Sequence, residues 1–318
     1  MHSYCPDLWN GFTIIKNGDI FNCCLLKPLK LGNIHRDNLQ DLINCADLIE
    51  LRKKSLIGKL ECYAGCNFVR KNINLDDYNK NYRINYEDLS RLHISFGELC
   101  NIRCVMCRHP DNHKKDNLIL DSKVLTEKID ISPFEDILLQ GGEPLCIKSC
   151  LNYMDYLASK NKKYMLLTNG LLIDKKVALK LVNHAKSVII SINAATKETH
   201  EKVNRGSNFK KILSNISLLN KYKKKLNTSI ILFGRMTITI HSLHEIPLFI
   251  DKYREFGFDL INFGYDRITV PQYLEEHSDF QKELRKNVTK SLLNSNIYEI
   301  DLQRLYQLNL IENTKGIC

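Results

Sequence analysis

Three closely spaced cysteines constrain this chain more than any other feature. Cys100, Cys104 and Cys107 form a C-x3-C-x2-C array. A closed iron–sulfur or zinc site takes four ligands. Three thiolates can therefore hold three irons of a cubane cluster and leave the fourth iron open, where another molecule can bind. A zinc knuckle and three unrelated buried thiols are the alternatives that the spacing alone leaves open.

Composition indicates a globular protein that works in a reducing compartment. The chain has 318 residues, of which 44% are hydrophobic and 26% charged, enough for one large domain and a small one. It has no apolar run of about 18 residues, and its N-terminal residues lack the basic start and apolar core of a secretion signal. We therefore expect a cytoplasmic protein with no membrane partner. Twelve cysteines that cluster in three places suit metal sites better than disulfides there.

The net charge of +10 raises the question of a nucleic-acid partner. Its lysines concentrate in short runs at 160–163 and 221–225, just before apolar segments, where solvated helix ends and turns explain them. The sequence shows no basic motif interleaved with aromatic residues. We therefore predict no nucleic-acid partner and rank RNA modification last among the possible functions.

The region from 88 to 270 alternates strand-like and helix-like segments. Six apolar runs read as strands, at 92–96, 136–140, 164–168, 187–192, 229–239 and 260–263. Near-continuous apolar strands separated by helices indicate a parallel α/β sheet. Because six units fall short of the eight in a complete barrel, we predict an α/β fold built as a partial (β/α)6 barrel. The predicted domains are a cysteine-rich module at 1–72, the barrel at 88–270 and a helical extension at 271–318.

Two further motifs lie at the ends of predicted strands. Gly141-Gly142-Glu143-Pro144 follows the second strand, and Thr168-Asn169-Gly170 closes the third. Each has a structural alternative: a glycine-rich turn in which Pro144 opens the next helix, and an Asn-Gly turn. Together with the three cysteines, the motifs resemble those of the radical S-adenosylmethionine (radical SAM) enzymes.

This resemblance implies two cofactors and a set of residues that bind them. The three cysteines would hold a [4Fe–4S] cluster, and S-adenosylmethionine (SAM) would bind at its open iron. The methionyl amine of SAM would be bound by the Gly-Gly-Glu-Pro segment, whose carboxylate and carbonyls accept hydrogen bonds from an ammonium group. Met106 would pack near the adenine. The remaining cofactor-binding residues implied by the family are Thr168, Asn169, Ser191, Asn193 and Arg205.

Three of these residues lie at or beyond the end of the fourth predicted strand. In the family pattern Ser191 would contact the ribose, and Arg205 would pair with the methionyl carboxylate, for which a guanidinium fork is well shaped. Asn193 stands where relatives carry an aspartate. A salt bridge on a helix surface is the structural alternative for Arg205.

The N-terminal cysteines resemble a SPASM domain, the auxiliary iron–sulfur module of many radical SAM proteins. The resemblance implies a second, auxiliary [4Fe–4S] cluster held by Cys5, Cys23, Cys62 and Cys66, with Cys24 as an alternative ligand. The module precedes the barrel instead of following it, and its last pair is spaced C-x3-C instead of C-x2-C. A zinc-binding minidomain is the alternative. Cys45 is expected to be a buried small side chain, and Cys318 a further ligand or a free thiol.

The resemblance implies reductive cleavage of SAM to a 5′-deoxyadenosyl radical that abstracts hydrogen from a substrate. We expect a peptide or protein substrate and an electron donor such as flavodoxin or ferredoxin. A dehydrogenase or epimerase of a small molecule, such as an amino sugar, and a non-catalytic iron–sulfur or sensor protein are the alternatives. The sequence singles out no acid or base residue.

Overall fold

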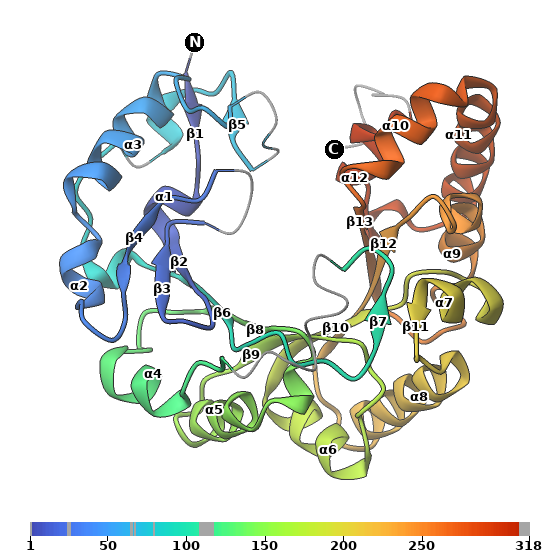
Figure 1. The fold of residues 1–318 in the computed structure, drawn as a ribbon, viewed down its shortest axis with the longest axis horizontal. Coiled ribbons are helices and arrows are strands. Elements are labelled where there is room, and N and C mark those ends of the chain that lie inside the picture. The colour runs from blue at the N-terminus through green and yellow to red at the C-terminus, as the bar shows by residue number, and fades with distance from the viewer. Residues whose placement is uncertain are drawn as a thin grey trace. The chain divides into compact units, whose positions relative to one another are not determined.

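The computed structural model describes residues 2–23, 27–63, 66, 68–78, 80–107 and 118–311 (Figure 1). Contacts between residues divide the chain into two units. The first comprises residues 1–99 with 115–165, and the second residues 100–114 with 166–318. The division falls within strand β9 (Tyr164–Thr168).

The sheet of the first unit joins the N-terminal segment to the first two strands predicted for the barrel. Strand β6 (Arg91–Ser95) lies between β8 (Asp136–Gln140) and β2 (Gly11–Ile14) and runs parallel to both. Strands β3 (Asp19–Phe21) and β4 (Lys30–Asn33) continue the sheet beyond β2 in antiparallel pairing. The cysteine-rich segment therefore shares hydrogen bonds with the strand that precedes the C-x3-C-x2-C array.

The backbones of β2 and β6 approach closely at Gly11. Its Cα partner is Arg91, and a Cβ on Gly11 would lie 2.1 Å from the Arg91 carbonyl oxygen. The backbone of Gly11 is extended, with φ at 179°, which every residue can adopt. The close approach of the two backbones, and not the torsion angle, therefore requires glycine here.

Arg52 of helix α3 (Ala46–Leu56) holds the N-terminal segment together from within. The side chain is 0% exposed. Its Nε donates to the Leu8 carbonyl, its Nη1 to the Tyr82 carbonyl and its Nη2 to the Ile43 carbonyl, each at 2.8 Å. Burial lowers the pKa of Arg52 to about 10, which still leaves it charged at neutral pH. Three carbonyl partners compensate the lost hydration of the guanidinium.

The second unit contains four parallel strands. They lie in the order β14 (Ile300–Asp301), β13 (Leu260–Tyr265), β12 (Ile231–Ile238) and β10 (Ala185–Ser191). Side chains alternate along them between a fully buried face and a half-buried one. A separate two-stranded ladder pairs β7 (Arg103–Cys104) with β11 (Asn204–Arg205).

The remaining elements are helices, short 3-10 helices and one pair of two-residue strands. In the first unit they are β1 (Ser3–Tyr4), β5 (Arg70–Lys71), α1 (Asp7–Asn10), α2 (Leu39–Leu42), α4 (Ser122–Lys128), α5 (Lys148–Ser159) and the 3-10 helices η1 (Leu75–Asp77), η2 (Tyr86–Asp88) and η3 (Pro144–Cys146). In the second they are α6 (Lys175–His184), α7 (Lys197–Val203), α8 (Phe209–Lys225), α9 (Ile246–Lys252), α10 (Thr269–Glu276), α11 (Ser278–Leu293), α12 (Gln303–Gln307), η4 (Leu243–Glu245) and η5 (Ile297–Glu299).

The predicted α/β alternation is confirmed. Each of the six predicted strands has a counterpart, from β6 to β13, and helices follow as expected. Strand β14 was not predicted, and it lies between helices α11 and α12 in the described part of the C-terminal stretch. The domain boundaries at 1–72, 88–270 and 271–318 stay a prediction.

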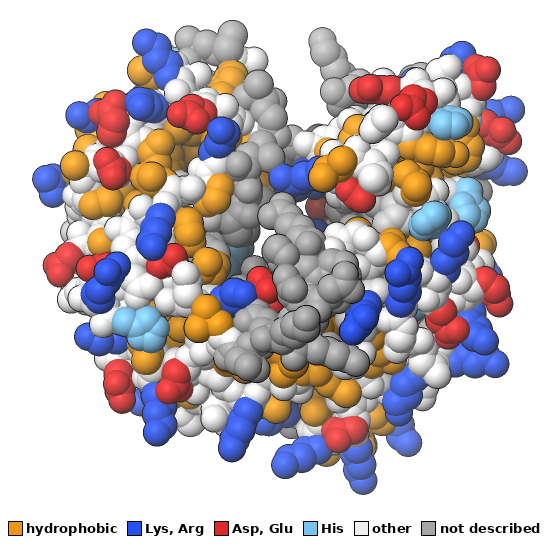
Figure 2. Space-filling model, viewed as in Figure 1, with side chains coloured by type: hydrophobic (Ala, Val, Ile, Leu, Met, Phe, Trp, Pro, Cys, Tyr) orange, Lys and Arg blue, Asp and Glu red, His pale blue; other side chains and the backbone are white. Residues whose placement is uncertain are grey.

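Within the described residues, no helix is both long and apolar enough to cross a membrane. On the face drawn in Figure 2, Lys and Arg side chains have Asp and Glu among them.

Replacing Gly11 should destabilise the fold. In Gly11→Ala the added methyl group would meet the Arg91 backbone, which cannot move without separating β2 from β6. We expect a loss of roughly 3 kcal/mol in the free energy of unfolding, at the upper end of overpacking effects. Urea denaturation followed by Trp9 fluorescence measures it. Asn10→Ala is the control, because it shortens the neighbouring side chain and adds no atom between β2 and β6. A Gly11→Ala protein as stable as this control would contradict the close contact.

Candidate iron–sulfur and cofactor sites

The three cysteines of the C-x3-C-x2-C array lie together in one loop of the second unit. The loop is fixed by β7, in which Cys104 pairs with Asn204 of β11. The Val105 amide donates to the Val203 carbonyl at 2.9 Å, and the Cys107 amide to the Cys104 carbonyl at 3.1 Å. All three cysteines are half-buried. The ladder thus holds the loop that carries the thiols in place by backbone hydrogen bonds.

The electrostatics of this loop suit a cationic metal group. Burial, followed by the charges of the neighbouring Cys100 and Cys107, raises the pKa of the Cys104 thiol to about 12. The three sulfurs are therefore close enough to disfavour one another as thiolates. Iron would supply the positive charge that offsets this repulsion, because the thiolate is the form that binds metal.

The Thr-Asn-Gly segment contacts the same loop. The Asn169 side-chain amide donates to Oδ1 of Asn101 at 2.8 Å. Gly170 has a φ of +78°, and its amide donates to Oγ1 of Thr168 at 3.1 Å. The predicted Asn-Gly turn is therefore present, and it also supports the residue that follows Cys100.

The Gly-Gly-Glu-Pro segment lies in the first unit, against the backbone that precedes the cysteine array. A Cβ on Gly142 would lie 2.3 Å from the Glu98 carbonyl oxygen, and one on Gly141 would lie 2.9 Å from the Gly97 carbonyl oxygen. The Glu143 amide donates to the Leu99 carbonyl at 2.8 Å. The two glycines therefore serve close packing of backbone on backbone.

Glu143 and Pro144 form the start of the 3-10 helix η3. The Glu143 side chain is 0% exposed, and one of its oxygens accepts the Leu145 amide at 3.1 Å. Pro144 is the first residue of that helix, which agrees with the structural alternative given for this motif. The carboxylate thus has a structural role in capping its own turn, and its predicted contact with SAM stays a prediction.

The residues after the fourth barrel strand have different surroundings. Asn193 is 3% exposed, and its side chain donates to Asn204 at 2.9 Å and accepts the Thr237 amide at 2.8 Å. It therefore joins two segments of the second unit. Arg205 is exposed and lies on β11 beyond the end of α7, so the salt bridge on a helix surface does not describe it. Ser191, at the end of β10, and Met106, in the cysteine loop, are half-buried.

The four N-terminal cysteines line one pocket in the first unit. This pocket has a volume of about 260 Å³. Its other lining residues include Asp7, Asn22, Lys27, Lys54, Lys59 and Glu61. A water molecule occupies about 30 Å³ in the liquid, so the pocket accommodates a group of several atoms. Cys45 does not line it and is half-buried at the start of α3, less buried than predicted. Cys24 and Cys318 lie outside the described residues.

The thiols of this pocket interact strongly. Burial raises the pKa of Cys5 to about 12, with contributions from Asp7, Cys23 and Cys66. A hydrogen bond between the sulfurs raises the pKa of Cys62 and lowers that of Cys66. Within the described ranges, no three His, Cys, Asp or Glu side chains stand in the arrangement that holds a single metal ion. The donor set fits a cationic cluster, which would stabilise the four thiolates together.

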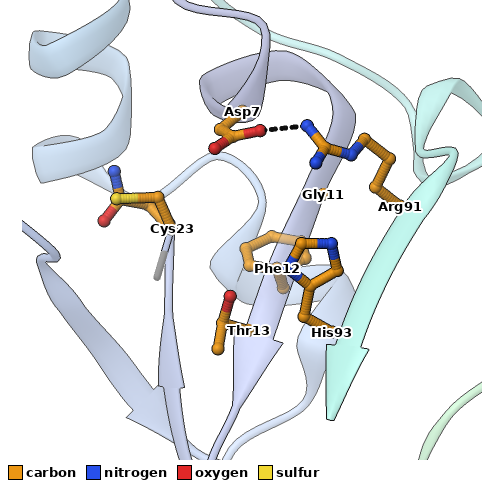
Figure 3. A pocket seen from close by; sticks show the side chains of 8 residues that line it. Asp7, Gly11, Phe12, Thr13, Cys23, Arg91 and His93 are labelled. Carbon is orange, nitrogen blue, oxygen red and sulfur yellow. Dashed lines mark hydrogen bonds and ion pairs between the residues drawn. The ribbon is translucent and has the colours of Figure 1, made fainter. Parts of the chain in front are cut away.

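An ion pair that sequence reasoning missed lies beside Cys23. Asp7 pairs with Arg91 across the start of β2 and β6, and Figure 3 shows this pair above Thr13 and His93. Burial, followed by the charge of Arg91, lowers the pKa of His93 to about 4, so this histidine is neutral at pH 7. An Asp directly after Cys-Pro was the only signal in the sequence, and its partner lies on another strand.

Glu245, in η4, is a second residue that sequence reasoning missed. The side chain of Glu245 is buried, and its carboxylate accepts the amides of Ala195 at 2.6 Å and Thr196 at 2.9 Å and the Thr196 hydroxyl at 2.6 Å. Burial alone would raise the pKa of Glu245, but these hydrogen bonds outweigh it and hold the pKa below its ordinary value of 4.5. Glu245 therefore fixes the loop that follows β10.

Comparison with known proteins identifies both regions. The model of the radical SAM superfamily matches residues 94–250, and that of the SPASM iron–sulfur cluster-binding domain matches residues 5–67. Residues 94–250 therefore form a radical SAM domain, and a SPASM domain precedes it in the chain. The predicted fold class is thereby confirmed, as are a [4Fe–4S] cluster with SAM and an auxiliary iron–sulfur site. Which residues bind each group stays a prediction.

Individual relatives match only part of this chain. A GTP 3′,8-cyclase of Clostridium perfringens is 30% identical over 157 residues, which cover 45% of this chain and 47% of the cyclase. The chain thus spans about half the length of this curated relative. SuiB of Streptococcus suis bound to the precursor peptide SuiA is 16% identical, with a TM-score of 0.46, covering 86% of this chain and 68% of SuiB. For anSMEcpe with bound AdoMet and the Cp18Cys peptide, the identity is 21% and the TM-score 0.44, covering 64% and 61%.

Removing one predicted ligand of the auxiliary site should halve the iron content. After anaerobic reconstitution we expect about eight irons per wild-type chain and about four in Cys23→Ala, because a [4Fe–4S] cluster needs its thiolate ligands. Iron and sulfide analysis measures this. Cys45→Ala, which removes a thiol outside the pocket, should keep about eight. Equal iron in Cys23→Ala and Cys45→Ala would show that Cys23 is not a ligand.

Removing the Glu245 carboxylate should destabilise the protein in a pH-dependent way. Glu245→Ala leaves the buried Ala195 amide and the half-buried Thr196 amide without their acceptor, which we expect to cost roughly 3 kcal/mol at pH 7. Because the folded pKa is lowered, this stabilisation is complete above about pH 4.5 and declines as the pH falls through the folded value. Urea denaturation at pH 7 and in steps below pH 4.5, followed by circular dichroism, measures both. The exposed Glu255→Ala should change stability by less than about 0.5 kcal/mol; a pH-independent difference for Glu245→Ala would refute the charged hydrogen bonds.

Proposed function

We propose that this protein is a radical SAM enzyme that abstracts a hydrogen atom from its substrate. The observation that carries the proposal is the gathering of Cys100, Cys104 and Cys107 in one loop anchored by the β7–β11 ladder. Three thiolates leave one iron of a cubane cluster without a protein ligand. A protein that only stored or sensed a cluster would have no need of this open position.

When bound, the cluster and SAM supply an electron and a 5′-deoxyadenosyl radical that takes hydrogen from the substrate. The chain's own residues would bind and orient these two groups. The cysteine loop holds the cluster, and Asn169 fixes Asn101 in that loop. Glu245 holds the segment after β10, where Ser191 stands as the proposed ribose contact. Arg205, exposed on the strand next to Cys104, is the proposed partner of the methionyl carboxylate.

We propose a peptide or protein as the substrate. The support is the SPASM domain at residues 5–67, because members of the superfamily that carry this module commonly modify peptides. The auxiliary pocket, with its four cysteines, would hold the second cluster of such an enzyme. We further propose a cytoplasmic location and a reducing partner such as flavodoxin or ferredoxin, since both clusters require a reduced environment.

A nucleotide substrate is the second candidate. The observation that favours it is the 30% identity to a GTP 3′,8-cyclase over 157 residues. The similarity to the cyclase covers less than half of this chain. We therefore place this candidate after the peptide, as the small-molecule form of the same radical chemistry.

Loss of one cysteine of the array should abolish SAM cleavage. Reconstituted wild-type protein with dithionite and SAM should form 5′-deoxyadenosine, whereas Cys104→Ala should give only background, because the open cluster is lost. Liquid chromatography of the nucleoside measures this, with Cys45→Ala as the control that keeps activity. A fully iron-loaded wild-type protein that forms no nucleoside would overturn the enzymatic proposal and favour the sensor alternative.

The same assay separates the two substrate classes. Nucleoside formation is compared without addition, with GTP deuterated in its ribose, and with peptides from cells grown on deuterated amino acids. Deuterium appears in 5′-deoxyadenosine only when the donor supplies the abstracted hydrogen. Deuterium transferred from the peptides would support a peptide substrate. Deuterium transferred from GTP would support the nucleotide substrate in its place.

A further inference from the structure

One row of polar side chains crosses the four parallel strands of the second unit. In the register of the sheet, Ser191 of β10 lies beside Arg235 of β12. Arg235 in turn lies beside Asn262 of β13, and Asn262 lies beside Asp301 of β14. Partners in parallel strands point to the same face of the sheet. Four polar residues at one level, in strands that are otherwise largely apolar, mark this face as distinct.

This face is the one turned away from helix α9. On the opposite face, Ile190 and Ile261 are at most 1% exposed, and the ring of Phe263 lies 5.9 Å from that of Phe249 in α9. Figure 1 shows α9 and α11 along one side of β12 and β13. The polar row is half-buried or exposed. In (β/α) barrels, substrates are bound toward the C-terminal ends of the strands, and Ser191 is the last residue of β10.

The guanidinium of Arg235 is only partly satisfied by the protein. It has five N–H donors, and within the described residues its one hydrogen bond runs from Nη1 to Oδ1 of Asn262 at 3.2 Å. Gly264 makes room for it, because a Cβ there would lie 3.0 Å from Nη2 of Arg235. Glycine in the middle of a strand is typical of a place where a ligand or another chain segment comes close.

Arg52 shows how the same protein satisfies an arginine that has a structural role. All three nitrogens of its guanidinium group donate to backbone carbonyls at 2.8 Å. Arg235 has no such set of carbonyls. An acceptor with two oxygens in a plane would match the donors that remain.

The charges around Arg235 also favour an anion. Burial is the main cause that lowers the pKa of Arg235, the charge of Arg304 lowers it further, and the charge of Asp301 raises it. Asp301 already accepts the Gln303 amide at 3.0 Å, and no carboxylate of the described chain lies within ion-pair distance of Arg235. Two guanidinium groups against one carboxylate leave net positive charge on this face.

We propose that Arg235, oriented by Asn262, binds an oxyanion of the substrate, either a carboxylate or a phosphate. The inference rests on the proposed function and names the chemistry that its substrate would carry. A carboxylate is the source expected for a peptide and a phosphate the source expected for a nucleotide. Arg235 would hold that group on the face where Ser191 stands.

Protection against arginine modification tests the site without turnover. Reconstituted protein is treated with phenylglyoxal, and the rate of labelling at Arg235 is measured by peptide mass spectrometry. The additions are SAM alone, SAM with inorganic triphosphate, SAM with glutarate, and SAM with sodium chloride at equal ionic strength. Arg254, an exposed residue paired with Glu299, is the internal control.

We expect one of the two oxyanions to slow labelling of Arg235 several-fold beyond SAM with chloride and to leave Arg254 unchanged. Slowing by triphosphate identifies a phosphate site, and slowing by glutarate a carboxylate site. The proposal is overturned if neither slows it, or if SAM alone gives full protection, which would assign the guanidinium to the cofactor. Because no SAM is cleaved, this result is independent of whether the enzymatic proposal holds.

Variants provide a second measurement. The dissociation constant of the protecting oxyanion, from isothermal titration, should rise at least about tenfold in Arg235→Gln and less in Arg235→Lys, which keeps the charge but loses the fork. Arg254→Gln should bind as wild type does. Equal affinity in Arg235→Gln and wild type would refute the site. If Arg235→Gln fails to fold, the labelling of the wild-type protein still decides.

Discussion

The close approach of Gly11 to Arg91 is the constraint on which the first unit depends. It sets the register of β2 against β6, and the ligand-bearing segments follow from that register. Cys5 and Asp7 lie just before β2, and Cys23 lies just after β3. Asp7 reaches Arg91 because both flank the same pair of strands. A SPASM domain that precedes its barrel is thus joined to the barrel's first strand by a parallel ladder, which orders the auxiliary pocket without a linker of its own.

The second unit is organised by the alternation of side chains along parallel strands. Apolar residues of β10, β12 and β13 pack against helices on one face, and this packing fixes the level of every residue on the other face. Ser191, Arg235 and Asn262 therefore stand side by side as a consequence of the core. The loops beyond the strands are fixed separately, by Glu245 after β10 and by the β7–β11 ladder at the cysteines. Core packing places the substrate face, and buried hydrogen bonds place the cofactor loops.

The six barrel strands could be predicted because each is a continuous apolar run, and the cysteine array because its spacing is local. Strand β14 escaped prediction because two residues, Ile300 and Asp301, carry no periodic signal. The pairing of β2 with β6 depends on a contact between residues 80 positions apart, which no local pattern encodes. Arg235 went unnoticed for a related reason: within an apolar strand, its meaning depends on the partners in neighbouring strands. Asn193 and Glu143 were assigned to the cofactor from motifs, whereas the structure also gives each a hydrogen-bonding role inside the protein.

The degree to which a buried charge is satisfied separates structural from functional residues here. Removing an ion from water costs several kcal/mol unless hydrogen bonds replace the lost hydration. Arg52 and Glu245 meet this requirement with backbone carbonyls and amides, so their charges need nothing more. The cysteine groups do not, because thiolates gathered in a half-buried loop repel one another, and a cationic cluster resolves the repulsion. Arg235 carries the opposite charge and has one amide partner in the described chain. By the same physical reasoning that assigns iron to the thiolates, its remaining donors call for an anion.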